Sequence, residues 1–265
     1  MPDHEVDVNA ALEVALEAAR RAIEVVHATP LGGVRTKADA ADPVTEVDTA
    51  VERAVRDLIG ARLPDHTIVG EEYGGEADGG PTWFCDPVDG TTNLSAGLPW
   101  TSFSLSLAVG STPLVGVVAD PWRREILHAV RGRGCFLNGG PVPERPEQRR
   151  GLTGGVVLTE WARHEPWTGM IAVLAALAER HCTTRVMGSS TLTLAHIAAG
   201  RCTGAVVGEF HPEDHLAATL LADEAGLAVW DESGTQQPFP RDGGVMVCAP
   251  EAADELFALW RDVTS

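Results

Sequence analysis

Residues 83–93 read Trp-Phe-Cys-Asp-Pro-Val-Asp-Gly-Thr-Thr-Asn, an apolar run that passes directly into acidic, hydroxyl and amide side chains. The apolar character of residues 82–85 predicts a buried strand. Asp86 and Asp89 follow at its end, three residues apart, so their carboxylates can converge on one point. Hard divalent cations such as Mg²⁺ take oxygen ligands of this kind and usually keep several waters. The segment therefore suggests a metal site at the end of a strand.

The turn after these carboxylates contains the residue types of an anion site. Gly90 permits close approach of a ligand to the backbone. Thr91 and Thr92 offer hydroxyl and N–H groups at a predicted helix start, which is a place that favours anions. An ordinary β-turn uses the same residue types, so these residues alone leave both interpretations open.

Two further acidic segments lie at the ends of predicted elements. Glu71 and Glu72 follow a short predicted strand at 67–69, and Asp214 lies near the start of a predicted helix at 212–225. Taken singly, Glu71 and Glu72 fit a solvated surface, and Asp214 fits a favourable charge at a helix N-terminus. Carboxylates gathered from three segments would repel one another unless cations neutralised them. Together they favour a metal site over three unrelated surface features.

Composition excludes several classes of function. The chain has 265 residues with 38 acidic and 20 basic side chains, so 38 − 20 gives a net charge of −18. Binding to nucleic acid or to an anionic membrane needs clustered Lys or Arg, and neither partner is expected. No apolar run approaches the ~20 residues of a membrane span, and no secretory leader is apparent. Five widely spaced cysteines without a CxxC pair predict reduced thiols and a cytoplasmic protein.

The pattern of apolar residues predicts two halves. Residues 1–145 are expected to form an α+β half, with helices at 9–26, capped by Asn9, and at 46–62, followed by antiparallel strands. Residues 146–265, which contain Asp214, alternate strands with helices, which predicts an α/β half. The segment 139–150, rich in Pro, Gly and charge, is the predicted boundary within one compact unit.

In this arrangement the sequence resembles the inositol monophosphatase-like superfamily of Mg²⁺-dependent, often Li⁺-sensitive sugar phosphatases. The resemblance covers most of the chain, and residues 83–93 are its most specific part. The matching segments, in order, are Lys37 with Asp42-Pro-Val-Thr-Glu-Val-Asp48, Gly70-Glu-Glu72, residues 83–93, Asp214-His-Leu-Ala-Ala218 and Glu224-Ala-Gly226. The resemblance implies a layered α-β-α-β-α sandwich, of mixed α+β and α/β character, that assembles as a homodimer.

The resemblance also implies a set of metal ligands. Glu71, Asp86 and the carbonyl of Val88 would hold one Mg²⁺. Asp86, Asp89 and Asp214 would hold a second, and Glu71 would help to hold a third ion that is rich in water. Mn²⁺ is expected as an alternative ion.

Catalytic roles follow from the same resemblance. Thr91, aligned by Asp48, and Glu71 would orient and deprotonate the attacking water. The backbone N–H groups of Gly90 and Thr91, beside Asp89, would hold the phosphate. Lys37, the chain's single lysine, would lie near the phosphate or a water on the metal, and a solvated loop lysine is the alternative.

The expected substrate pocket departs from the family pattern. Glu213 replaces the usual tryptophan before the third aspartate, and Val207 replaces an acidic residue that grips ring hydroxyls in some inositol phosphatases. Glu209 and His211 lie nearby and could substitute. Gly188-Ser189-Ser190 occupies the segment that usually lines the pocket, where two hydroxyls suit a polyol or ribose. A helix cap by one of these serines is the alternative.

These features define one main hypothesis and two alternatives. The main one is Mg²⁺-dependent hydrolysis of a small phosphomonoester, such as an inositol phosphate, histidinol phosphate, sugar phosphate or nucleoside phosphate. The alternatives are a 3′-phosphonucleotide or bisphosphate phosphatase of the same superfamily, and a weakly active protein that binds metal and polyol phosphate. No residue suggests a covalent nucleophile, and Cys85 is predicted as core. His215, directly after Asp214, is interpreted either as a helix-surface residue or as a residue that supports the metal ligands.

Overall fold

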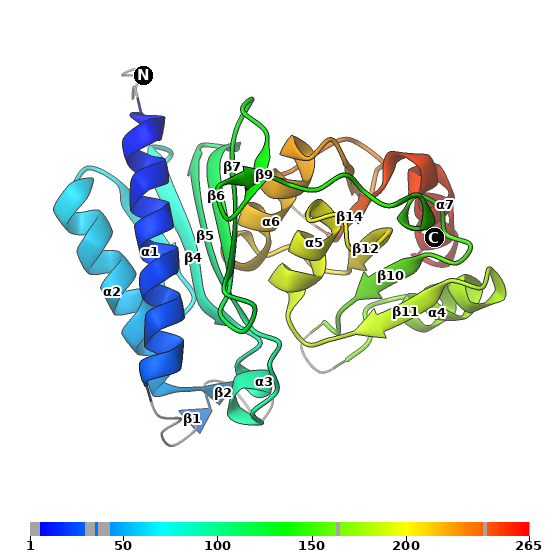
Figure 1. Cartoon of the computed structure of the whole chain (residues 1–265), viewed down its shortest axis with the longest axis horizontal. Coiled ribbons are helices and arrows are strands. Elements are labelled where there is room, and N and C mark those ends of the chain that lie inside the picture. The colour runs from blue at the N-terminus through cyan, green and yellow to red at the C-terminus, as the bar shows by residue number, and fades with distance from the viewer. Residues whose placement is uncertain (1–5, 30–34, 37–42, 163–164, 241–242, 265) are drawn as a thin grey trace.

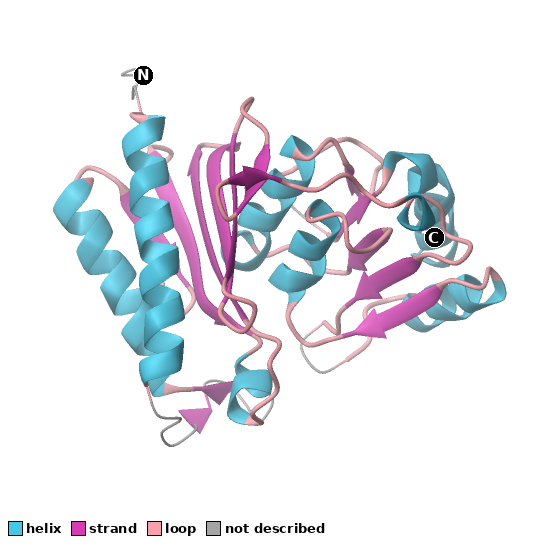
Figure 2. Cartoon of the chain, in the orientation of Figure 1, coloured by secondary structure: helices cyan, strands magenta, loops and turns pink. Residues whose placement is uncertain are grey.

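The computed structural model describes residues 6–29, 35–36, 43–162, 165–240 and 243–264. Its elements stack in five layers, in the order α-β-α-β-α, which follow one another from left to right in Figure 1. The two sheets stand out as the magenta layers of Figure 2. This arrangement confirms the layered sandwich expected from the sequence.

The first layer consists of α1 (Val8–Ala28) and α2 (Glu46–Arg62). One face of α1 is buried because its alanine and valine residues recur at helical spacing against the first sheet. The expected cap at Asn9 is wrong: the Asp7 carboxylate accepts the N–H groups of Asn9 and Ala10, at 3.0 Å each, so the helix starts before Asn9. The bounds of α2 are as predicted, and a capping box fixes its start.

The second layer is a seven-stranded sheet. Its strands lie in chain order: β3 (Thr67–Gly70), β4 (Pro81–Asp89), β5 (Ser102–Val109), β6 (Thr112–Asp120), β7 (Glu125–Val130), β8 (Cys135–Leu137) and β9 (Gly140–Pro141). All neighbours are antiparallel except β3 and β4, which are parallel. The pairing of β4 with β5 shifts register between Asp86 and Asp89, so both carboxylates lie at an irregular strand end.

The fourth layer is a five-stranded sheet of mixed direction. Its spatial order is β11 (Thr183–Val186), β10 (Val156–Thr159), β12 (Gly204–Val207), β14 (Val245–Cys248) and β13 (Ala228–Asp231). The first three strands are parallel, as the alternation of strands and helices predicts. β14 is antiparallel to both of its neighbours, because the described residues between β13 and β14 form no crossover helix.

The remaining helices occupy the middle and outer layers. α5 (Ser190–Ala198) and α6 (Pro212–Glu224) lie between the sheets, whereas α4 (Met170–Glu179) and α7 (Ala253–Thr264) cover the outer face of the second sheet. The short elements are β1 (Arg35–Thr36), β2 (Pro43–Val44), α3 (Thr91–Ser95) and the 3-10 turns Glu147–Arg149 and Pro250–Ala252. Among the helices of the described ranges, none is long and apolar enough to cross a membrane.

The middle helices join the two sheets into one packing unit. Residues 215–222 of α6 are buried all round, as expected for a helix between two sheets. One apolar cluster contains Val118 and Leu127 from the first sheet together with Leu194 and Ala218 from the helices. Strands of the first sheet end at residue 141 and those of the second begin at residue 156. The division at residue 145 stays a prediction.

Candidate active site

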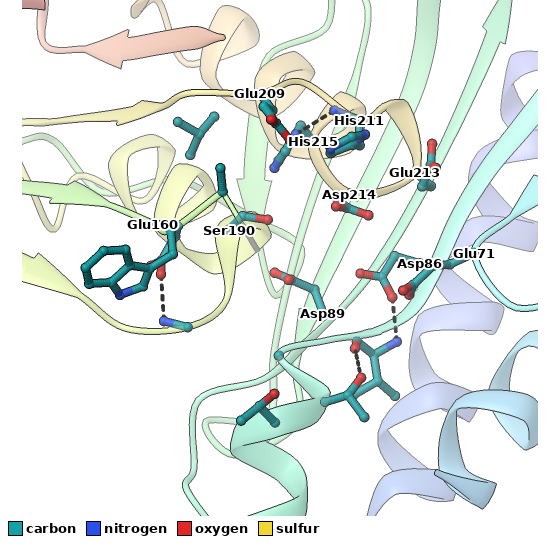
Figure 3. A pocket seen from close by; sticks show the side chains of 18 of the residues that line it. Glu71, Asp86, Asp89, Glu160, Ser190, Glu209, His211, Glu213, Asp214 and His215 are labelled. Carbon is teal, nitrogen blue, oxygen red and sulfur yellow. Dashed lines mark hydrogen bonds and ion pairs between the residues drawn. The ribbon is translucent and has the colours of Figure 1, made fainter. Parts of the chain in front are cut away.

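A cavity of about 490 Å³ lies where the end of β4 meets the carboxyl ends of β10 and β12 and the start of α6. Figure 3 shows acidic side chains from four segments directed toward it. The predicted site residues that line it are Glu71, Asp86, Val88, Asp89, Gly90, Thr91, Gly188, Ser190, Glu209, His211 and Asp214. Asp48 and Ser189 lie just behind this lining and hydrogen bond to it. Lys37 lies outside the described residues.

Asp86 is the most deeply placed carboxylate of the cluster. It is 2% exposed, and its Oδ1 accepts the N–H of Val88 at 2.8 Å. Burial raises the pKa of Asp86 well above its usual value, and the negative charges of Glu71, Asp214 and Asp89 raise it further. The carboxylates of Glu71, Asp89 and Asp214 beside buried Asp86 concentrate negative charge in the cavity.

Asp89 is held from the other half of the chain. Its Oδ2 accepts the Ser189 hydroxyl at 2.6 Å and the Thr191 N–H at 2.7 Å. Ser189 also caps α5, so the capping alternative is correct for this serine, and the same hydroxyl orients Asp89. Burial raises the pKa of Asp89, although the hydrogen bond from Ser189 acts in the opposite direction.

Thr91 and Asp48 form a hydrogen-bonded pair. The Thr91 hydroxyl lies 2.8 Å from Oδ1 of Asp48 and 2.9 Å from the carbonyl of Val88. Asp48 is fully buried, and its Oδ2 accepts the N–H and hydroxyl of Thr45. Burial raises the pKa of Asp48 against these hydrogen bonds. A Thr91 hydroxyl that donates to Asp48 keeps its lone pairs available to a water in the cavity.

The donor set and charge of the cavity fit Mg²⁺. Its ionisable lining comprises carboxylates and two histidines, with no Lys or Arg among the described lining residues. No three His, Cys, Asp or Glu side chains of the described ranges stand close enough to enclose an ion as they are. Mg²⁺ does not require such a cage, because it is commonly held by one or two carboxylates together with waters and substrate phosphate.

Gly90 is required by both backbone conformation and space. Its φ is +92°, and a Cβ there would lie 2.8 Å from the carbonyl oxygen of Gly188 and 3.0 Å from that of Trp100. A side chain would therefore push apart the two segments that meet at the cavity.

Two buried glutamates that support the site, Glu160 and Glu52, were not predicted from the sequence. Glu160 is 5% exposed, and Glu52 is fully buried, where it accepts the N–H groups of Glu72 and Tyr73 at 2.7 and 3.2 Å. Glu160 comes directly after β10, as Glu71 comes directly after β3, so its position in the apolar pattern offered a usable signal. Glu52 lies in the middle of a helix, and no local pattern indicates its partners twenty residues away.

The part of the cavity at the start of α6 contains two histidines. Nε2 of His211 lies 3.4 Å from a carboxylate oxygen of Glu209. The backbone N–H of His211 donates to Nδ1 of His215 at 2.9 Å. The prediction that His215 lies on a helix surface is wrong, since it is 3% exposed. Burial, with a smaller contribution from His211, lowers its pKa to about 3. His215 is buried because α6 lies between two sheets.

Glu160 gives a pH prediction for metal-free protein. Burial raises its pKa to about 7 against hydrogen bonds that lower it. The folded protein holds the carboxyl proton of Glu160 more tightly than the unfolded chain does. The resulting contribution of Glu160 to stability is complete below about pH 4.5 and is lost as the pH rises through about 7. The loss amounts to about 3 kcal/mol. The free energy of unfolding, measured by denaturant titration in EDTA, should therefore fall more steeply between about pH 5 and pH 8 for wild type than for Glu160→Gln. Equal slopes would contradict the assignment.

Known proteins are similar to this chain in sequence or in fold over at least 85% of either chain. The chain is 34% identical to Nus factor SuhB of Pasteurella multocida, over 94% of this chain and 95% of that one. It is 33% identical to inositol monophosphatase 2 of Solanum lycopersicum, over 85% and 88%. The solved structure of a Thermotoga maritima IMPase superposes with a TM-score of 0.85 at 28% identity, covering 96% and 97%.

These likenesses, with the family match, define the class of the protein as a metal-dependent phosphomonoesterase. Within that class, the chain belongs to the inositol monophosphatase family, whose pattern it matches over residues 3–264. The family is Mg²⁺-dependent and acts on small phosphorylated substrates.

Proposed function

We propose that the protein hydrolyses a small phosphomonoester in this cavity and releases inorganic phosphate. One observation carries the proposal: buried Asp86 is surrounded by the carboxylates of Glu71, Asp89 and Asp214, and no Lys or Arg stands in the described lining. A phosphate dianion can enter such a cavity only when cations offset this charge. An anionic substrate can therefore bind beside these carboxylates only when divalent metal ions are bound between them.

The proposed ligands are the four carboxylates and the carbonyl of Val88, which would hold two to three Mg²⁺ ions, with Mn²⁺ as an alternative. Bound Mg²⁺ supplies a lowered pKa for water and stabilisation of the negative charge on the phosphoryl oxygens. The irregular end of β4 presents Asp86 and Asp89 from one strand, while α6 presents Asp214 from its first turn. Glu71 approaches from the residue after β3.

The chain's own residues orient the nucleophile. Thr91 accepts a hydrogen bond from the attacking water while its hydroxyl donates to Asp48, which fixes the lone pair that faces the water. Glu71 accepts the proton that the water loses. The water oxygen forms a new bond to phosphorus, the ester P–O bond breaks, and the leaving alkoxide takes a proton from solvent water to become the alcohol. The N–H groups of Gly90 and Thr91 hold the phosphate, and Lys37 is proposed to assist.

The alcohol is proposed to bind between the segment 188–190 and residues Glu209 and His211. The backbone of Gly188 and the hydroxyl of Ser190 line the cavity there, and both can hydrogen bond to a hydroxylated alcohol. Inositol-like, histidinol-like and sugar or nucleoside monophosphates all meet this description. A second phosphate would meet acidic residues in the described lining, which argues against bisphosphates.

We also propose that the protein is a homodimer of the cytoplasm. β11 is an edge strand of the second sheet, and its residue Val186 is exposed within the described part of the chain. Both observations support pairing of this edge with a second copy. The five cysteines are all free, as expected in a reducing compartment.

A phosphate-release screen tests the proposed function. The wild type is offered inositol, histidinol, sugar and nucleoside monophosphates and one bisphosphate, each with Mg²⁺, with EDTA and with Mg²⁺ plus Li⁺. We expect Mg²⁺-dependent release from at least one monoester, inhibited by Li⁺ and absent in EDTA. Failure to release phosphate from every ester would refute the proposal, and preference for the bisphosphate would reverse the substrate assignment.

A further inference from the structure

Glu160 occupies a central place among the parallel strands of the second sheet. It comes directly after β10, whose parallel neighbours β11 and β12 end beside it. Side chains that follow parallel strands gather at one edge of the sheet, the usual place for a ligand site in such folds. Glu160 lines the cavity there while remaining 5% exposed.

The Glu160 carboxylate accepts three hydrogen bonds from the segment that follows β11 and from α5. Oε1 accepts the Met187 N–H at 3.1 Å and the Thr193 hydroxyl at 2.6 Å, and Oε2 accepts the Gly188 N–H at 2.7 Å. Figure 3 shows Glu160 joined to this segment. Both oxygens of one buried carboxylate are therefore used to hold two successive backbone N–H groups.

Asn93 holds the opposite edge of the same two residues. Its Nδ2 lies 2.8 Å from the carbonyl of Met187 and 3.2 Å from that of Gly188. Gly188 has a φ of +84°, and a Cβ there would lie 2.8 Å from Nδ2 of Asn93, so no side chain fits. The segment is thus fixed on its N–H edge by Glu160 and on its carbonyl edge by Asn93.

This fixed segment leads directly to groups that the proposed reaction uses. Ser189 follows it and donates to Oδ2 of Asp89, and the Thr191 N–H donates to the same oxygen. Gly188 and Ser190 line the part of the cavity assigned to the alcohol. A change in the Glu160 contacts would therefore move the alcohol's surroundings, whereas the two donors to Asp89 belong to the cap and first turn of α5.

We propose that Glu160 is a positioning residue that fixes residues 187–190 and thereby determines which alcohol the site accepts. This inference rests on the proposed function, because it assigns the alcohol to that side of the cavity. Glu160 acts through backbone N–H groups and touches neither phosphate nor metal. Its loss should affect an ester with a hydroxylated alcohol far more than an ester whose alcohol carries no further hydroxyl groups.

The test is the variant Glu160→Gln, assayed on two esters. Gln keeps the size of Glu but turns an amide NH₂ toward one of the three donors, which then loses its acceptor. The esters are the best hydroxylated substrate of the wild type and p-nitrophenyl phosphate. We expect kcat/KM for the hydroxylated ester to fall about tenfold or more, chiefly through KM, and that for p-nitrophenyl phosphate to change less than about threefold.

Glu224→Gln is the matched control. The Glu224 carboxylate also accepts two backbone N–H groups, from Gly132 at 2.6 Å and Gly134 at 2.7 Å, but it is not among the residues that line the cavity. This control should lose stability without changing the ratio of kcat/KM for the two esters. Thr193→Val removes one donor to Glu160 without a new polar group, and it should shift the ratio in the same direction by a smaller factor. It replaces Glu160→Gln if that variant fails to fold.

Amide hydrogen exchange supplies a readout that is independent of activity. Protection of residues 187–191 should fall in Glu160→Gln and stay unchanged in Glu224→Gln. Equal losses for both esters, an unchanged ratio, or unchanged protection would overturn this proposal while the proposed function stands. A wild type that hydrolyses neither ester would refute the proposed function and this inference with it.

Discussion

Asp89→Asn should lower kcat/KM for Mg²⁺-dependent phosphate release by about a thousandfold or more, equivalent to roughly 4 kcal/mol of transition-state stabilisation. The Asn carbonyl oxygen can still accept the Ser189 hydroxyl and the Thr191 N–H, so the local structure is retained. The second carboxylate oxygen becomes an NH₂ group, which cannot bind a cation. Steady-state kinetics over a Mg²⁺ titration measures the loss.

Thermal unfolding in EDTA separates this effect from misfolding. Because burial raises the pKa of Asp89, its ionised form destabilises the metal-free protein, and the Asn variant should melt no lower than wild type. Asp120→Asn is the control, since Oδ1 of Asp120 also accepts two backbone N–H groups, at 2.9 and 3.0 Å, but in a turn that is not among the lining residues. Activity of Asp89→Asn within tenfold of wild type would contradict its proposed role.

Thr91→Val should reduce kcat by a factor of about 10² to 10³ with little change in KM. Valine keeps the shape of threonine but lacks the hydroxyl that lies 2.8 Å from Asp48. The water would then lack the acceptor that Asp48 orients, although Glu71 and the other carboxylates remain. Stopped or continuous phosphate detection at saturating substrate measures kcat directly.

Two further variants make this prediction specific to the hydroxyl. Thr91→Ser restores the donor to Asp48 and should recover activity to within about tenfold of wild type. Ser95→Ala removes a different hydroxyl of α3, one that donates to the carbonyl of Thr92, and should leave kcat near the wild-type value. If Thr91→Val and Ser95→Ala behave alike, the Thr91–Asp48 pair has no part in the reaction.

Sequence patterns predict those parts of this fold that local chemistry determines. The start of α2 follows from a capping box at Thr45 and Asp48, whose residues lie close together in the chain. Asp86 and Asp89 were recognisable because an apolar strand runs directly into them. The start of α1 was misplaced, because Asp7 and Asn9 are comparable capping residues and only the backbone conformation decides between them.

Other parts depend on contacts between distant segments. His215 and Glu52 are buried because other elements pack against their helices, and neither helix alone records that packing. The antiparallel placement of β14 depends on how the chain returns after β13, which the alternation of elements does not determine. Glu160 is an intermediate case: its position after a strand was visible, but its partners at Met187 and Gly188 were not.

The central claim is that the carboxylates of this cavity act through divalent metal on a phosphomonoester. The most direct test is one measurement: phosphate release by the wild type from its best monoester, after removal of metal with EDTA and during stepwise return of Mg²⁺. We predict that release stops in EDTA and returns with Mg²⁺ in wild type, and that Asp89→Asn shows no comparable recovery. Undiminished release in EDTA, or full recovery of Asp89→Asn at the Mg²⁺ concentration that restores wild type, would contradict the claim.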